Sequence, residues 1–189
     1  MTAHYHCSPT RGLTQLLPLQ PESFAKPAAV YMTLLRPMAL MYGIRHFEYT
    51  YGYTKEMQMY YLEHFPHAAE ALYSGKSASL YLCAPDETEE TSIPNERISF
   101  QPVKITEEIF IPDVYRALLT EEEKGTLVIH RFETLTEKQQ DWIIRAECHE
   151  ILERKLLSKD SPMAQWMKKT YPQSWQMALE KQLEENLHT

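Results

Sequence analysis

The chain has 189 residues, of which 43% are apolar, and its formal net charge is −7 at pH 7. This length suits one domain with an extension, and the apolar content is sufficient to build a core. An acidic chain without a run of Lys or Arg lacks the feature on which general nucleic-acid binding depends, so we do not expect that function.

The cysteines and glycines argue against several kinds of site. Cys7, Cys83 and Cys148 are far apart and form no CxxC pair, which disfavours a disulfide framework and a zinc–cysteine site. The five glycines form neither GxGxxG nor GxxxxGK[ST], so Rossmann and P-loop nucleotide sites have no support. No apolar run approaches the roughly 20 residues that span a bilayer, and no signal-peptide pattern opens the chain. We therefore expect a cytoplasmic protein without a membrane partner.

The N-terminal part of the chain predicts strands and one short helix. Tyr5–Ser8 is expected to form a short strand, and Arg11–Pro27 a loop, because prolines interrupt any helix there. Ala28–Leu35 predicts a strand, since aromatic and β-branched residues follow a proline. Arg36–Ile44 predicts a short helix with Pro37 in its first turn.

An aromatic-rich segment follows. Tyrosines recur at period two over 49–53, which predicts a strand or an extended lid. Residues 55–76 predict a helix that is interrupted at a proline and ended by a glycine. The aromatic side chains over 42–61 fit either core packing or a wall on which a flat ring stacks.

The middle of the chain predicts further strands. Ala78–Pro85 is an apolar, aromatic run typical of a strand, and residues 86–96 form an acidic surface loop. Residues 97–113 predict one or two strands, with Pro102 marking an edge or a bulge. Residues 125–132 predict another short strand.

The C-terminal part is expected to be helical. Thr136 and Gln139 form a capping-box pattern that opens a helix over 136–157. The apolar residues of this helix that recur at helical spacing, and are expected to face the core, are Ile144, Cys148, Ile151 and Leu152. Ser161 is a candidate N-cap of the next helix, and a last helix runs over about 174–187.

Two pairs of His and Glu have the spacing of metal ligands on one helix face. They are Glu63 with His67 and His149 with Glu153. Neither place contains HExxH, and charged residues on an amphipathic helix usually face solvent. We therefore predict no metal site.

Three separated segments together resemble a known family. YHCS at Tyr5–Ser8 is similar to the HGS or HGT strand that opens the fold of this family. VYMTLLRPMALMY at Val30–Tyr42 has a tyrosine on a strand and a second tyrosine eleven residues on, as in its second motif. NERISFQPVKITEEIFIP at Asn95–Pro112 has a glutamate opening a strand, as in its third. In this order they resemble the His-Tyr-Glu branch of the ADP-ribosyltransferases, which includes poly(ADP-ribose) polymerases, diphtheria toxin and bacterial rifampin ADP-ribosyltransferases.

The resemblance implies a fold, a reaction and a set of site residues. The fold would be α+β, with split β-sheets in an ADP-ribosyltransferase-like domain over 1–133 and a helical extension over 134–189. The function would be transfer of ADP-ribose from NAD, the substrate, to an unidentified acceptor, a protein or a small molecule. Glu96 would be the catalytic residue, because a carboxylate stabilises the cationic ribose centre that forms as nicotinamide leaves. The residues implied to bind NAD are His6, Cys7, Ser8, Tyr31 and Tyr42.

The chain departs from the family pattern at two positions. Cys7 stands where the family has a glycine that contacts nicotinamide, and Ala39 stands where a helix serine binds its carboxamide. These departures leave open a catalytically silent module of the same fold that binds NAD or a partner. A third possibility is an RNA 2′-phosphotransferase-like enzyme, which is disfavoured because it needs basic residues for the phosphate and arginine patches are scarce near His6.

Overall fold

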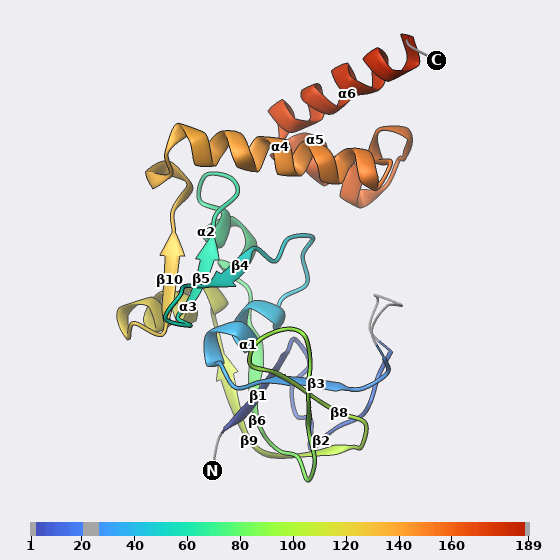
Figure 1. Cartoon of the computed structure of the whole chain (residues 1–189). Coiled ribbons are helices and arrows are strands. Elements are labelled where there is room, and N and C mark those ends of the chain that lie inside the picture. The colour runs from blue at the N-terminus through green and yellow to red at the C-terminus, as the bar shows by residue number, and fades with distance from the viewer. Residues whose placement is uncertain (1–2, 21–26, 188–189) are drawn as a thin grey trace. The chain divides into compact units, whose positions relative to one another are not determined.

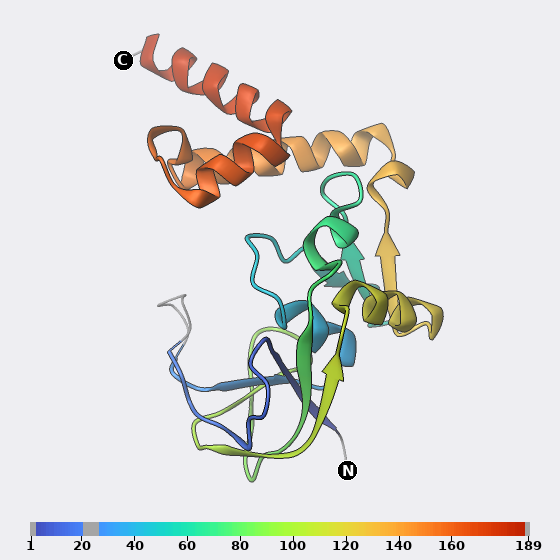
Figure 2. The same cartoon turned by 180° about the vertical axis from the view of Figure 1, so that it is seen from behind.

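The computed structural model describes residues 3–20 and 27–187, which form two compact units (Figures 1 and 2). The segments of the first unit are Met1–Tyr49, Lys55–Met59 and Ala69–Val128, and those of the second are Thr50–Thr54, Tyr60–Ala68 and Ile129–Thr189. The chain mixes helices with antiparallel strand pairs, so the predicted α+β class is confirmed. A domain boundary at residue 133 stays a prediction.

A seven-stranded sheet with the order β2-β9-β6-β1-β3-β8-β7 organises the first unit (Figure 1). Its strands are β1 (His4–Ser8), β2 (Gln15–Leu16), β3 (Val30–Thr33), β6 (Ala78–Ala84), β7 (Glu89–Glu90), β8 (Glu96–Ser99) and β9 (Val103–Ile111). The predicted strands at the N-terminus, before the first helix and at 78–85 are therefore confirmed. Pro102 lies between β8 and β9, so the segment predicted as one or two strands forms two.

The long loop predicted over 11–27 contains a little regular structure. The two residues of β2 pair with β9, and Leu19 forms an isolated antiparallel bridge with Ala29. Residues 21–26 of this predicted loop lie outside the described residues.

Two helices of the first unit are joined by an ion pair. Helix α1 (Arg36–Tyr42) has Pro37 in its first turn, as predicted, and buries five of its residues. Helix α3 (Val114–Glu123) was not predicted, although Asp113 caps it by accepting a hydrogen bond from the Arg116 N–H at 2.9 Å. The guanidinium of Arg36 forms an ion pair with Glu121, whose side chain is only 4% exposed.

The helix predicted over 55–76 is wrong for its first half. Residues Met59–Leu62 form strand β5, and helix α2 occupies only Ala68–Tyr73. Strand β5 lies between β10 (Leu127–His130) and β4 (Tyr51–Tyr53) in a three-stranded sheet. Met59 and Tyr61 are buried while their neighbours in the strand are less so, which is the period of a strand. The period could not be recognised in the sequence because all four residues of β5 are apolar or aromatic.

The second unit is built mainly from C-terminal helices. They are α4 (Glu137–Glu153), α5 (Pro162–Thr170) and α6 (Pro172–Leu187), together with the short 3₁₀ turns η1 (Phe132–Thr134) and η2 (Leu156–Ser158). The capping box of Thr136 and Gln139 and the N-cap at Ser161 are both present, as predicted. None of the described helices combines the length and apolar character that crossing a bilayer requires.

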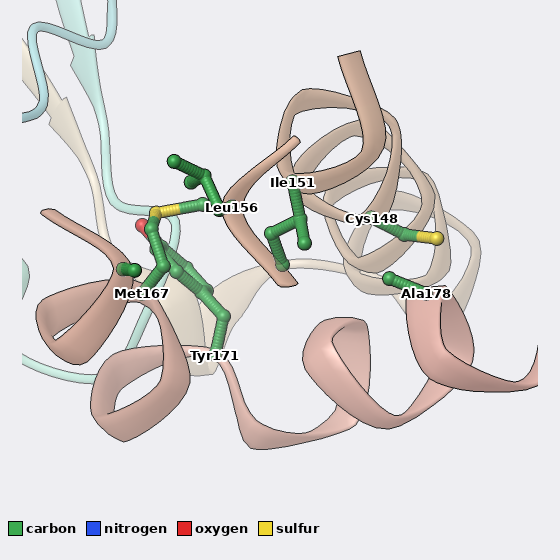
Figure 3. Packing of buried hydrophobic residues seen from close by; sticks show 7 residues of the cluster. Cys148, Ile151, Leu156, Met167, Tyr171 and Ala178 are labelled. Carbon is green, nitrogen blue, oxygen red and sulfur yellow. The ribbon is translucent and has the colours of Figure 1, made fainter. Parts of the chain in front are cut away.

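The core of these helices confirms most of the predicted apolar face (Figure 3). Figure 3 shows Cys148 and Ile151 of α4 directed toward side chains of α5 and α6. Leu152 packs against this core while partly buried, and Ile143 rather than Ile144 is the buried isoleucine near the start of α4. The core residues are Cys148, Ile151, Leu156, Ala164, Met167, Tyr171 and Ala178.

Candidate functional site

A cavity of about 370 Å³ opens in the first unit beside β1, β3 and α1. Its size is within the range of small-molecule sites. The residues that line it include His6, Cys7, Tyr31, Thr33, Tyr42 and Glu96. Segments separated by up to 90 positions in the sequence therefore meet around one space.

The cavity lies where β1 and β3 come together. Tyr5 of β1 is opposite Thr33 of β3, and Thr33 is in turn opposite Glu96 of β8. Beyond the Tyr5–Thr33 pair, the side chain of His6 bonds to the backbone of β3, since its Nδ1 lies 2.9 Å from the carbonyl oxygen of Tyr31. Strand pairing thus brings Tyr31, His6 and Glu96 together in the lining of the cavity.

The protonation of His6 follows from this contact. A carbonyl oxygen only accepts, so Nδ1 carries the proton, and Nε2 of the neutral ring is a hydrogen-bond acceptor. Burial lowers the pKa of His6, while the bond to Tyr31 acts weakly in the other direction. The imidazole is therefore neutral at pH 7 and suited to accept a hydrogen bond from a ligand hydroxyl.

Glu96 supplies a buried carboxylate. It begins β8, is 5% exposed, and its Oε1 accepts a hydrogen bond from the Thr91 hydroxyl at 2.9 Å. Burial and the nearby charge of Glu96 both raise the pKa of the Tyr31 phenol, in that order of importance. A carboxylate in a sheltered position interacts strongly with positive charge that develops in the cavity.

Tyr42 is held by an aromatic stack. Its ring lies parallel to that of Tyr49, with centroids 4.9 Å apart and an interplanar angle of 15°. The Tyr49 ring stacks in turn on His46, at 4.2 Å, and His46 Nε2 lies 2.8 Å from the hydroxyl of buried Tyr73. Burial, helped by the charge of Lys76, lowers the pKa of His46 to about 4. The stack is therefore uncharged at neutral pH and supports one wall of the cavity.

The side chain of Cys7 is accommodated by a glycine at the end of α1. Cys7 is 6% exposed, and a Cβ added to Gly43 would overlap its Sγ. Burial raises the pKa of the Cys7 thiol to about 12, so this thiol is protonated and not a nucleophile at neutral pH. The side chain of Cys7 therefore fits because residue 43 has no side chain.

We expect Gly43→Ala to destabilise the protein through this contact. The backbone of Gly43 has φ −68° and ψ −16°, which alanine adopts without strain, so the cost is steric and should be about 1–3 kcal/mol. Urea denaturation measures it. In a Cys7→Gly background the same substitution should cost clearly less, because the obstructing sulfur is gone. An equal cost in both backgrounds would show that the sulfur is not the obstacle.

One of the predicted NAD-binding residues, Ser8, lies elsewhere. Ser8 ends β1 and does not line the cavity; its hydroxyl accepts a hydrogen bond from the Thr10 N–H at 3.1 Å. Glu108 on β9 does not line the cavity either, and it accepts hydrogen bonds from Ser79 and from the Gly12 N–H. Strands β6 and β1 separate β9 from β3 in the sheet order, so Glu108 is no alternative to Glu96.

The two predicted His/Glu pairs differ from metal ligand sets. Residue 63 precedes α2, so Glu63 and His67 are not on one helix; Glu63 accepts a hydrogen bond from the Phe132 N–H at 3.1 Å. His149 and Glu153 are 3.9 Å apart and exposed on α4. No group of three or more metal-ligating side chains occurs among the described residues.

Sequence reasoning missed two polar residues of the cavity lining. Thr33 lies opposite Glu96, and Arg45 follows α1 three residues beyond Tyr42. Thr33 lies in the strand predicted over Ala28–Leu35, two residues from Tyr31, so the alternation of a strand places both side chains on one face. Arg45 had no such signal, because it lies in irregular structure.

The chain was also compared with known proteins. No protein-family model and no curated protein matches it.

Proposed function

We propose that the chain binds NAD in this cavity and transfers its ADP-ribose group to an acceptor. The observation that carries the proposal is that His6, Tyr31, Tyr42 and Glu96, named from three separate sequence motifs, all line one cavity. These residues offer a hydrogen-bond acceptor for a ribose hydroxyl, two aromatic rings for the nicotinamide and a carboxylate for the ribose cation. The proposal rests on this convergence and on the motif resemblance.

The chemistry of each residue follows from its position. The aromatic rings of Tyr31 and Tyr42 stack on the planar nicotinamide, and Nε2 of His6 accepts a hydrogen bond from a ribose hydroxyl. When the bond between nicotinamide N1 and ribose C1′ breaks, its electron pair leaves with nicotinamide, and C1′ becomes an oxocarbenium centre. The carboxylate of Glu96 accepts from the ribose 2′-hydroxyl and stabilises this charge. A nucleophilic oxygen or nitrogen of the acceptor then bonds to C1′ and loses its proton.

One observation favours a second candidate, a silent NAD-binding module. Ala39 of α1 lines the cavity at the position where the family has a serine, so no hydroxyl is offered there to the carboxamide. A hydrogen bond of this kind contributes about 0.5–1.5 kcal/mol. Its loss weakens nicotinamide binding without removing the carboxylate on which transfer depends, so we place transfer first.

Nicotinamide and NAD are both expected to raise the melting temperature of the protein. A ligand that binds only the folded state stabilises it in proportion to the logarithm of its concentration over Kd. Tyr42→Ala should abolish the rise with nicotinamide while the unliganded protein stays folded, since Tyr42 is 41% exposed. Differential scanning fluorimetry with each ligand at millimolar concentration makes the measurement.

Phe47→Ala provides the matched control. Phe47 is similarly exposed, at 48%, but it does not line the cavity, so its variant should retain the shift. Absence of any shift in the wild-type protein with either ligand would overturn the proposed function. A shift that survives in Tyr42→Ala would remove this tyrosine from the site.

A further inference from the structure

Arg45 gives the cavity a second charged group. Among the described residues that line it, Arg45 is the only one with a permanently positive side chain, since His6 is neutral at pH 7. The guanidinium is on an exposed residue, whereas the carboxylate of Glu96 is 5% exposed. The cavity therefore combines a sheltered negative charge with an accessible positive one.

This arrangement favours a ligand whose charges complement those of the cavity, positive toward Glu96 and negative toward Arg45. Such a ligand has a cationic or cation-forming part that enters the sheltered region and an anionic part that stays near the opening. A pyridinium ribonucleotide has this polarity, because its ring is positive and its diphosphate negative. The planar guanidinium of arginine forms paired hydrogen bonds with phosphate oxygens, which a lysine does not reproduce.

We propose that Arg45 binds the diphosphate of the dinucleotide and so determines that NAD, rather than nicotinamide or its nucleoside, is the favoured ligand. This inference rests on the proposed function. Arg45 follows Tyr42, the last residue of α1, by three positions, so the ring-stacking wall and the phosphate contact come from one short segment at the end of α1. The phosphate contact fixes the ligand at one end while Tyr31 and Tyr42 hold the ring at the other.

The test compares three ligands on the wild-type protein and on Arg45→Gln by isothermal titration calorimetry. NAD and ADP-ribose both have the diphosphate, whereas nicotinamide lacks it. Arg45→Gln should weaken binding of NAD and ADP-ribose by about five- to twentyfold, the scale of a charge-assisted hydrogen bond at an exposed position. Nicotinamide affinity should stay within about twofold, because the variant removes no group that contacts the ring.

Ionic strength and a control variant sharpen the comparison. Raising the salt concentration should weaken ADP-ribose binding more in the wild-type protein than in Arg45→Gln, since salt screens the guanidinium–phosphate contact. Arg145→Gln, at an exposed position of α4 that does not line the cavity, should bind all three ligands as the wild type does.

The possible outcomes separate the two proposals. Unchanged affinity of Arg45→Gln for NAD and ADP-ribose would overturn the role of Arg45 and leave the proposed function standing. An equal loss for nicotinamide would also overturn it, because the substitution would then act on the whole cavity. If none of the three ligands binds the wild-type protein, the proposed function fails together with this inference.

Discussion

Replacing Glu96 by glutamine is expected to lower release of nicotinamide from NAD by at least about a hundredfold, because loss of one electrostatic contact to a transition state typically costs 10²–10³ in rate. NAD affinity should stay within a few-fold of the wild type. In the proposed reaction the carboxylate acts mainly on the charge that develops as the glycosidic bond breaks, so it should contribute little to ground-state binding. Chromatographic measurement of nicotinamide release, with and without candidate acceptors, gives the rate.

The structure explains why this variant should fold. The Oε1 atom of Glu96 accepts a hydrogen bond from the Thr91 hydroxyl, and the amide oxygen of glutamine can accept the same bond. The substitution therefore removes the charge and preserves the shape and this contact.

The matched control is Glu89→Gln. Glu89 is an exposed residue of β7 and does not line the cavity, so its variant should release nicotinamide at the wild-type rate. Glu90 is less suitable, because it pairs with Arg97 at 2.7 Å and Arg97 in turn donates to the carbonyl oxygen of Glu96. Wild-type activity in Glu96→Gln would show that the glutamate assignment is wrong. Binding of NAD without release in the wild-type protein would favour the silent module.

Replacing Arg36 by methionine is expected to lower the free energy of unfolding by about 2–3 kcal/mol, since it leaves a buried carboxylate without its main cation. The Glu121 side chain is 4% exposed, and without Arg36 it retains the Thr126 hydroxyl, at 2.8 Å, and Lys124, at 3.5 Å, as polar contacts. Helix α1 has seven residues and no side-chain cap at its N-terminus, so the ion pair to α3 also anchors the helix that ends at Tyr42.

Chemical denaturation measures this loss, and two further variants identify its cause. The double variant Arg36→Met/Glu121→Gln should recover part of the stability, because the buried charge is then absent. Arg154→Met removes the exposed partner of Glu150 on α4 and should cost less than about 1 kcal/mol. If Arg36→Met is no more destabilising than Arg154→Met, the Arg36–Glu121 pair does not anchor α1.

The correctly predicted elements depend on short-range patterns. Thr136 and Ser161 cap their helices because a side-chain oxygen reaches a backbone N–H three residues on, which needs no distant partner. The strand at Ala78–Ala84 is buried over most of its length and therefore appears in the sequence as a continuous apolar run. Tyr31 and Tyr42 could be paired through the motif resemblance, which has one tyrosine on a strand and a second eleven residues on in a short helix, and they lie on β3 and α1.

The elements that were predicted wrongly or missed depend on neighbours distant in the sequence. Met59–Leu62 has the composition of either a helix or a strand, and it is a strand because β10 and β4 flank it. Helix α3 buries Val114, Leu118 and Glu121 at helical spacing, and the glutamate is compatible with the interior through its ion pair with Arg36, a residue distant in the sequence.

The sequence by itself therefore determined the α+β class and the caps of the C-terminal helices, and its motif resemblance named His6, Tyr31, Tyr42 and Glu96 among the candidate site residues. Only the tertiary structure decided that these four surround one cavity, since β3 brings Thr33 between Tyr5 and Glu96 through its pairing with β1 and β8. It also decided that Ser8 lies outside the cavity, that Arg45 belongs to its lining, and that Cys7 fits beside Gly43. The physical reason is that strand pairing and side-chain packing join residues at long sequence separation, where spacing and composition contain no information about contact.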